Sequence, residues 1–220
     1  MLAADGRLPV PFRLPSKCDT AQQMRYVFFD LGNVLVHFDP NLACRNVAQL
    51  VGREESEVFA AMYGTGIETR YERGDLNSSQ FAAALRVELA SEFATGDLLR
   101  EMSAMFTPNA AMETVIGTLR QRGIPLGILS NTCPAHWDWV MAQAWPVTTG
   151  WYRDAVLSFE VGHMKPEPEI YQRAAEVAGV APSEIFFTDD RLENVEAARE
   201  AGWMAEVFHD VEMLRRQLNA

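Results

Sequence analysis

The chain has 220 residues, with 30 acidic and 19 basic side chains and a formal net charge of −11. This length suits one domain, or one domain with an insertion, and 48% hydrophobic residues argue against general disorder. The acidic balance argues against a broad nucleic-acid or anionic-membrane surface. An anionic small molecule stays open as a ligand, because a bound cation or one basic group can reverse the sign inside a pocket.

The N-terminal residues 1–24 mix prolines and basic residues with short apolar pieces. They lack the continuous apolar core of a secretory signal, and no apolar run of the chain reaches the ~18 residues that a membrane-spanning helix needs. The three cysteines, Cys18, Cys44 and Cys133, match no zinc or CxxC spacing. We therefore predict a loosely ordered extension over residues 1–24, reduced thiols, and a cytoplasmic protein without a membrane segment.

The first structured element that we expect is a buried strand, Tyr26–Phe29, which ends at Asp30. Residues 41–108 then follow a helical pattern without any strand-like run. Within it, apolar residues recur at four-residue intervals from Phe81 to Leu89, behind an N-cap region at Asn77. Glycines break this stretch into several helices. Because it is too long for a connection, we predict an inserted helical cap over residues 41–108.

The second half of the chain alternates apolar strands with helices. We expect strands over 125–129, 155–158, 184–187 and 204–208, and helices over 112–120, 168–178 and 193–201. This alternation is typical of βαβ units and of a mostly parallel sheet covered on both faces. The fold class predicted is therefore α/β, with a Rossmann-like three-layer core from residues 25–40 and 109–220 and the helical cap inserted between them.

Polar side chains follow three of these strands, where parallel sheets bind their ligands. They are Asp30, the pair Ser130-Asn131 and the pair Asp189-Asp190, and Lys165 lies in a loop between the last two. Close carboxylates repel one another unless a cation sits between them, and hard oxygen ligands favour Mg²⁺. Asp30 could then attack a phosphoryl group, while the hydroxyl, the amide and the lysine bind its oxygens.

Each of these residues also has a plain structural explanation. A single Asp after a strand often caps a turn or helix, and Asp189-Asp190 could cap the helix that follows. Ser130-Asn131 alone is an ordinary turn, and Lys165 alone is a solvated surface residue. The chemical interpretation depends on all of them occurring together in this order.

Four segments together resemble the haloacid dehalogenase superfamily, and the resemblance spans nearly everything from Arg25 onward. They are Phe28-Phe29-Asp30-Leu31-Gly32-Asn33-Val34-Leu35, Ile128-Leu129-Ser130-Asn131, the segment Val161–Tyr171 around Lys165, and the segment Phe186–Asn194 around Asp189-Asp190. The resemblance implies that Asp30 is the nucleophile and a Mg²⁺ ligand, with the Gly32 carbonyl, Asp190 and Asp189 at the metal. It also implies that Ser130, Asn131 and Lys165 bind phosphate, and that Asn194 reaches the metal through water.

The nearest branch by this resemblance contains the glucose-1-phosphate phosphatases and the phosphatase domain of soluble epoxide hydrolase. Most phosphatases of the superfamily have an Asp two residues after the nucleophile as general acid and base. Here Gly32 stands at that place and has no side chain to donate a proton. General acid–base help is worth ~10²–10⁴-fold, so its absence should lower the rate or narrow the choice of leaving group unless another residue supplies it. His37 and Asp39 are candidates, although both are better explained as the start of the linker to the cap.

The choice of substrate is expected to depend on the cap. Residues 63–66 and 70–74 are candidate substrate loops, because glycines permit close approach and polar groups could meet sugar hydroxyls. Glu72 and Arg73 could equally form a solvated surface pair. Aromatic residues after the second motif, Trp137 and Trp139, could wall the pocket or pack in the core.

We therefore predict a Mg²⁺-dependent phosphatase that acts on a small phosphorylated metabolite through an aspartyl-phosphate. The substrate class that we expect is a sugar phosphate such as an aldose 1-phosphate. The chain is expected to be a monomer or a weak homodimer. One alternative is a weak or inactive module that binds phosphometabolites or proteins, suggested by Gly32. The other is a 2-haloacid dehalogenase, which Asp189-Asp190 disfavour because the dehalogenases of this superfamily need no metal.

Overall fold

The computed structural model describes residues 24–219, so the predicted extension over residues 1–24 lies outside the described residues except for Met24, which is buried. The strands of the described chain are β1 (Tyr26–Phe29), β2 (Val36–Phe38), β3 (Phe106–Pro108), β4 (Leu126–Ser130), β5 (Asp154–Leu157), β6 (Ile185–Asp189) and β7 (Met204–Val207). Its α-helices are α2 (Pro40–Val51), α3 (Glu55–Phe59), α4 (Ile67–Arg73), α5 (Ser78–Leu89), α6 (Thr95–Ser103), α7 (Met112–Gln121), α8 (Pro134–Ala142), α9 (Ser158–Val161), α10 (Pro168–Ala178), α11 (Leu192–Glu200) and α12 (Val211–Leu218). A π-helix covers Ala60–Gly64, and a 3₁₀ turn covers Pro182–Glu184.

Five strands form one parallel sheet in the order β5-β4-β1-β6-β7. β1 lies at its centre and pairs with β4 on one side and β6 on the other. All four residues of β1 are buried, as expected for a short apolar run in a sheet covered on both faces. The predicted α/β fold with a parallel sheet is confirmed, including the position of each predicted strand.

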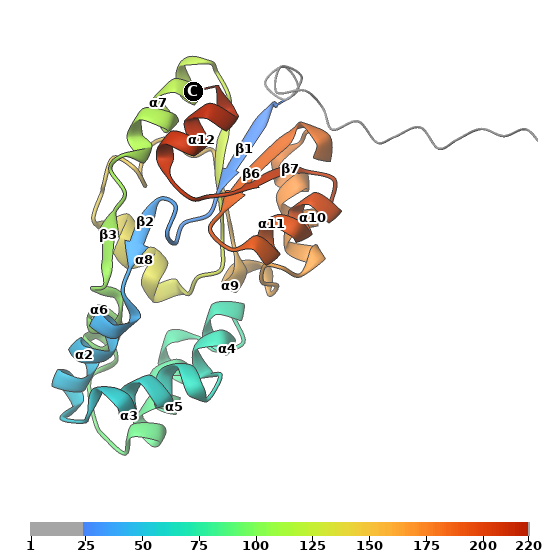
Figure 1. Cartoon of the computed structure of the whole chain (residues 1–220). Helices are drawn as coiled ribbons and strands as arrows, with labels where there is room; N and C mark the ends of the chain where they lie inside the picture. The colour runs from blue at the N-terminus through green and yellow to red at the C-terminus, as the bar shows by residue number, and fades with distance from the viewer. Residues whose placement is uncertain (1–23, 220) are drawn as a thin grey trace, which may run out of the picture.

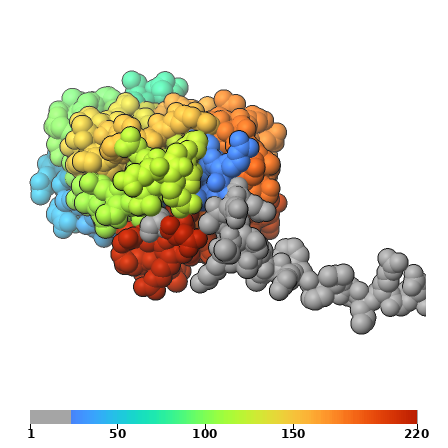
Figure 2. All heavy atoms as spheres, turned by 90° about the horizontal axis from the view of Figure 1, so that it is seen from above, coloured from blue at the N-terminus to red at the C-terminus, as the bar shows by residue number. Residues whose placement is uncertain are grey.

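Helices cover both faces of this sheet (Figure 1). Val27 and Phe29 of β1 face one apolar cluster, which includes residues of α7 and α12. Tyr26 and Phe28 face the other cluster, which includes residues of α10 and α11. Figure 2 shows the red atoms of α12 against the yellow-green segment that contains α7. The alternation of buried side chains along β1 thus produces the three-layer core.

The expectation that residues 41–108 contain no strand is wrong at their last three residues. β3 pairs in antiparallel fashion with β2, with His37 opposite Thr107 and Phe38 opposite Phe106. The two strands form a small ribbon beside the main sheet, through which the chain leaves for the helices and returns (Figure 1). A three-residue strand that ends in proline leaves no periodic pattern, because its pairing partner lies far away in sequence.

Helices α2 to α6 gather at one end of the molecule (Figure 1). They bury an apolar cluster separate from the two that cover the sheet, with Phe81, Leu85 and Leu89 of α5 among its members. Asn77 accepts a hydrogen bond from the Gln80 amide in a capping box, as the N-cap prediction requires. These contacts support the helical cap over residues 41–108, which we retain as a proposal for the domain boundaries.

Helix α4 connects the cap to the core through hydrogen bonds and an ion pair. The Ser158 hydroxyl donates to the Glu72 carbonyl at 2.6 Å, and the Tyr71 hydroxyl accepts from the Ala135 amide at 3.2 Å. Arg73 forms a two-pronged ion pair with Glu167, whose nearest N–O distance is 2.5 Å. Residues 70–73 are thus helical, although we expected a loop, and Arg73 pairs across to the core instead of with Glu72.

Gly74 ends α4 at a point where its backbone lies close to the backbone of Phe159 in α9. It has φ +87°, and a Cβ there would clash with the Phe159 carbonyl oxygen. Gly52 ends α2 with φ +66°, but a Cβ there would meet nothing within 4 Å. The two glycines therefore share a left-handed backbone and differ in the space around them.

Gly74→Ala should accordingly destabilise the protein more than its matched control Gly52→Ala. The left-handed backbone costs each variant ~1–2 kcal/mol, and the clash with α9 adds ~1–3 kcal/mol at Gly74 only. Urea unfolding of both variants measures the difference. Equal losses of unfolding free energy would contradict the close contact between the end of α4 and Phe159.

No helix among residues 24–219 is long and apolar enough to cross a membrane. Cys44 and Cys133 are buried free thiols, and Cys18 lies outside the described residues.

Candidate active site

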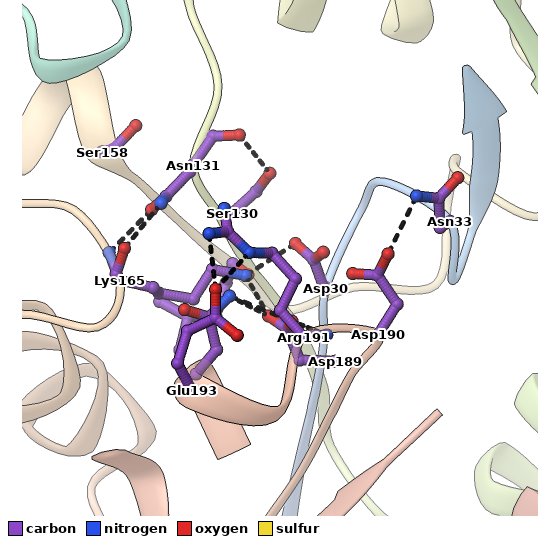
Figure 3. A network of polar contacts seen from close by, with 12 residues as sticks. Asp30, Asn33, Ser130, Asn131, Ser158, Lys165, Asp189, Asp190, Arg191 and Glu193 are labelled. Atoms are coloured by element: carbon purple, nitrogen blue, oxygen red, sulfur yellow. Dashed lines mark hydrogen bonds and ion pairs between the residues drawn. The ribbon is translucent and has the colours of Figure 1, made fainter. Parts of the chain in front are cut away.

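Asp30, Ser130 and Asp189 meet at one edge of the sheet. Asp30 directly follows β1, while Ser130 and Asp189 end β4 and β6, the two strands that flank it. Since the strands are parallel, their carboxyl ends lie side by side, as Figure 3 shows for these residues and Asp190. The three side chains predicted at the strand ends are therefore brought together.

Lys165 lies between two of the carboxylates. Its Nζ donates to Asp30 Oδ1 at 2.7 Å, to Asp189 Oδ2 at 2.6 Å and to the Leu129 carbonyl at 2.9 Å. Its side chain is 1% exposed, so the solvated surface lysine is excluded. All three hydrogen atoms of the ammonium have acceptors, which fixes one positive charge beside Asp30.

Asn131 holds the backbone of Lys165 in place. Its Oδ1 accepts from the Lys165 amide at 2.7 Å, and its Nδ2 donates to the Lys165 carbonyl at 2.8 Å. The side chain predicted to bind phosphate is thus engaged with the loop of the third motif. Ser130 is buried, and its hydroxyl is 3.3 Å from the Asn131 carbonyl.

Asp189 is completely buried and accepts four hydrogen bonds. Besides Lys165, the donors are the Arg191 amide at 2.9 Å and Asn194 Nδ2, which is 3.0 Å from each carboxylate oxygen. Asp190 is half-buried, and its Oδ2 accepts from Asn33 at 2.8 Å. Asp189 is therefore occupied with orienting Lys165, whereas Asp190 has acceptor capacity left for another ligand.

The carboxylate oxygens of the site are suitable ligands for a divalent cation. Asp30, Asp189 and Asp190 each place a carboxylate oxygen within 4.8 Å of the others. When they are ionised, three carboxylates against the single ammonium of Lys165 leave two negative charges uncompensated. Oxygen donors with excess negative charge suit Mg²⁺.

Burial dominates the ionisation of this cluster. Burial raises the pKa of Asp30 to about 7, the Lys165 ammonium opposes that rise, and the Asp189 charge adds to it. Burial by itself would lower the pKa of Lys165, but Asp189 and Asp30 outweigh it and raise that pKa above its usual value. Lys165 is therefore a permanent cation at neutral pH, and Asp30 gains from any added positive charge.

Two adjoining cavities open at the site. The strand-end cavity is lined by Asp30, Lys165, Asp190 and Arg191, among others. The aromatic cavity is lined by Tyr63, Met105, Phe106, Ser130 and His136, among others. Five residues line both of them: Gly32, Phe38, Glu68, Glu72 and Asn131.

The residues that line both cavities mark the boundary between them, and the cap contributes two carboxyl groups to this boundary. Glu68 and Glu72 lie one turn apart on α4. Burial, followed by the charge of Glu72, raises the pKa of Glu68 to about 8. Burial also raises the pKa of Glu72, to about 7, against the opposing charges of Arg191 and Lys165. From the sequence we predicted Glu72 only as a cap residue and did not predict Glu68, although its four-residue spacing from Glu72 places both on one face of a helix.

The other candidates from the sequence lie elsewhere. Asp39 caps α2 by accepting from the Asn41 amide at 2.9 Å, and His37 is exposed on β2. Neither lines a cavity of the site, which agrees with the linker explanation. Trp137 and Trp139 pack against the apolar core beside the sheet. His136 does line the aromatic cavity, and burial lowers its pKa to about 4, so its imidazole is neutral.

Known proteins show the same architecture. D-ribitol-5-phosphate phosphatase of Bacteroides thetaiotaomicron is 27% identical over 198 residues, covering 82% of this chain and 89% of that protein. A haloacid dehalogenase-family enzyme from the same organism, solved in complex with magnesium and inorganic phosphate, superposes with a TM-score of 0.75. It is 26% identical and covers 87% of this chain and 98% of that chain.

A third comparison concerns the fold alone. L-2-haloacid dehalogenase of Xanthobacter autotrophicus superposes with a TM-score of 0.61 at 22% identity, covering 89% of this chain and 82% of that chain. The narrower resemblance to glucose-1-phosphate phosphatases and soluble epoxide hydrolase stays a prediction. Residues 24–202, which include Asp30, Ser130, Lys165 and Asp190, match the family model of haloacid dehalogenase-like hydrolases. With so much of the chain matched and its polar strand ends assembled as that resemblance requires, the chain belongs to the haloacid dehalogenase-like hydrolases.

Proposed function

We propose that the chain is a Mg²⁺-dependent phosphatase that cleaves a small phosphorylated metabolite through an aspartyl-phosphate on Asp30. The observation that carries this proposal is the placement of Lys165, 2.7 Å from Asp30 and 2.6 Å from Asp189, beside three carboxylates within 4.8 Å of one another. A nucleophilic carboxylate, a fixed cation and a set of oxygen ligands are what phosphoryl transfer between anions requires.

In the first half of the reaction, an Asp30 oxygen attacks the phosphorus atom in line with the departing alkoxide, giving an aspartyl-phosphate. In the second half, water attacks the same phosphorus and releases Asp30 as a carboxylate. Lys165 stabilises negative charge on the phosphoryl oxygens, and Asn131 keeps Lys165 in position through two hydrogen bonds to its backbone. Bound Mg²⁺, held by Asp30, the Gly32 carbonyl and Asp190, would supply the charge that screens the phosphate from Asp30.

The comparisons support this function at the level of small phosphorylated metabolites. One relative of similar length is named D-ribitol-5-phosphate phosphatase, and one solved relative binds magnesium and inorganic phosphate. We retain a sugar phosphate as the proposed substrate. The aromatic cavity beside the strand-end cavity offers a place for the leaving group, and Ser130 at the end of β4 is part of its lining.

The assay that tests this function is phosphate release from an aryl phosphate and from a panel of phosphorylated metabolites, with Mg²⁺ or with excess chelator. We expect turnover with Mg²⁺ and loss of nearly all turnover with chelator, restored when Mg²⁺ is added back. The reason is that the carboxylate cluster repels a dianionic substrate when its two excess charges are uncompensated.

Two other outcomes would favour the alternatives. Phosphate binding without turnover, unchanged in Asp30→Asn, would indicate a binding module. Chloride release from a 2-haloacid without any metal would indicate a dehalogenase.

A further inference from the structure

The proposed reaction lacks a proton donor for the leaving alkoxide. Gly32, two residues after Asp30, has only hydrogen for a side chain, and His37 and Asp39 lie away from both cavities. A donor has to reach the point where the phosphoryl group in the strand-end cavity joins the leaving group in the aromatic cavity. Of the described residues that line both cavities, Glu68 and Glu72 are the ones with titratable side chains.

The position of Glu72 at this boundary is fixed by core contacts on its own helix. Its carbonyl accepts the Ser158 hydroxyl at 2.6 Å, and its neighbour Arg73 is paired with Glu167. On its other side, Tyr71 is buried and accepts from the Ala135 amide. Three successive residues of α4 are therefore attached to the core, which holds the Glu72 carboxyl against the site.

The charges around Glu72 distinguish it from Glu68. Lys165 and Arg191 act on the Glu72 carboxyl, whereas Glu72 is the charged group that acts on Glu68. The other titratable groups that line the two cavities are Asp30 and Asp190 from the strand ends, with Tyr63 and His136 on the aromatic side. Cys133 lines neither cavity, but burial and then the charges of Glu72 and Glu68 raise the pKa of its thiol. The charge of the Lys165 ammonium thus acts on the Glu72 carboxyl, whereas the charge that acts on Glu68 is that of Glu72 itself.

We propose that Glu72, supplied by the cap, is the general acid and base of the reaction in place of the side chain missing at Gly32. This inference rests on the proposed phosphatase function. As the P–O bond to the leaving group breaks, its electron pair stays on the leaving oxygen, which takes the Glu72 proton. In the second step the attacking water gives a proton to the Glu72 carboxylate while its oxygen bonds to phosphorus, and the bond to Asp30 breaks. Glu72 ends the cycle protonated, as it began.

The ionisation of Glu72 suits both steps. Its pKa of about 7 leaves comparable amounts of acid and carboxylate at neutral pH, which is the range where acid–base catalysis is efficient. The docked cap therefore completes the site with a proton donor as well as with walls.

The test compares Glu72→Gln with wild type on two kinds of substrate, in the full chain with saturating Mg²⁺. One is an alkyl phosphate that the wild type cleaves, whose alkoxide needs a proton to leave. The other is para-nitrophenyl phosphate, whose phenolate leaves without one. We expect kcat for the alkyl phosphate to fall ~10²–10⁴-fold and the first-turnover release of nitrophenolate to fall less than about threefold. The alkaline limb of the alkyl-phosphate pH profile should also disappear in the variant.

Glu68→Gln is the matched control, one turn away on the same helix and also at the boundary. It is expected to keep the wild-type difference between alkyl and aryl substrates, even where its KM changes. An equal loss on both substrates in Glu72→Gln, or no loss on the alkyl phosphate, would overturn the role of Glu72. Transfer of the leaving-group effect to Glu68→Gln would overturn it as well. A wild type that is silent on every phosphate would overturn the phosphatase function and this role with it, whereas an active wild type separates the two.

Discussion

Asp30→Asn should abolish phosphate release, with a fall in kcat on the order of 10⁴-fold or more, the size expected when a catalytic nucleophile is removed. The amide cannot form the aspartyl-phosphate, although it has nearly the same shape as the carboxylate. Folding should survive, because the change removes one of three carboxylates crowded within 4.8 Å and relieves their repulsion. Phosphate release and urea unfolding, measured on the same preparation, separate the two effects.

A control for this variant is Asp75→Asn, which changes an exposed carboxylate just after α4 and should keep wild-type turnover. Acid-quenched wild type should carry phosphate on Asp30, detected by mass spectrometry, and Asp30→Asn should carry none. Turnover retained in Asp30→Asn, or phosphate found on another residue, would show that the nucleophile is assigned wrongly.

Lys165→Met should lower both stability and activity. The ammonium is fully enclosed and hydrogen-bonded to Asp30, Asp189 and the Leu129 carbonyl. Removing it leaves two buried carboxylates without their partner, and breaking a buried ion pair from one side costs ~3–5 kcal/mol. Turnover should be lost at the same time, because Arg191, the other basic side chain that lines the described strand-end cavity, is paired with Glu193.

The double variant Lys165→Met/Asp189→Asn distinguishes charge from packing. Neutralising Asp189 removes one of the stranded charges, so unfolding free energy should return in part while turnover stays lost. Arg100→Met, at a side chain that is 58% exposed, serves as the surface control and should change stability by less than about 1 kcal/mol. A loss in Lys165→Met no larger than in this control would contradict the buried cluster.

The sequence predicted the main sheet well because its strands are short apolar runs that end in polar residues. β1 is buried at every position, and α10 begins and ends where proline and glycine indicate. The prediction failed at β3, whose pairing with β2 depends on two segments brought together across the entire cap. Helix α8 was not predicted either. Its own apolar and aromatic residues are distributed on all sides of the helix, so they give no one-sided hydrophobic pattern.

The sequence predicted which residues form the candidate site better than it predicted the contacts between them. Asp30 and Asp189 follow strands, so their meeting follows from a parallel sheet. The Asn131 side chain forms two hydrogen bonds with the backbone of Lys165, 34 positions away. No local sequence pattern predicts a contact between residues so far apart. The cap carboxyls were harder still, because the placement of Glu72 depends on how α4 docks against Ser158.

The β2–β3 ribbon has a consequence for how such a protein can diversify. Because Phe38 lies opposite Phe106, the chain leaves the core and returns to it at neighbouring points of the β2–β3 ribbon. Everything between these two residues can lengthen, shorten or be exchanged without shifting the register of β1, β4 or β6. Selection can therefore rebuild the helices that meet the substrate while the strands that carry the nucleophile stay constant. A chimaera joined at this ribbon would inherit its nucleophile from one parent, and its substrate and the proton donor proposed on the cap from the other.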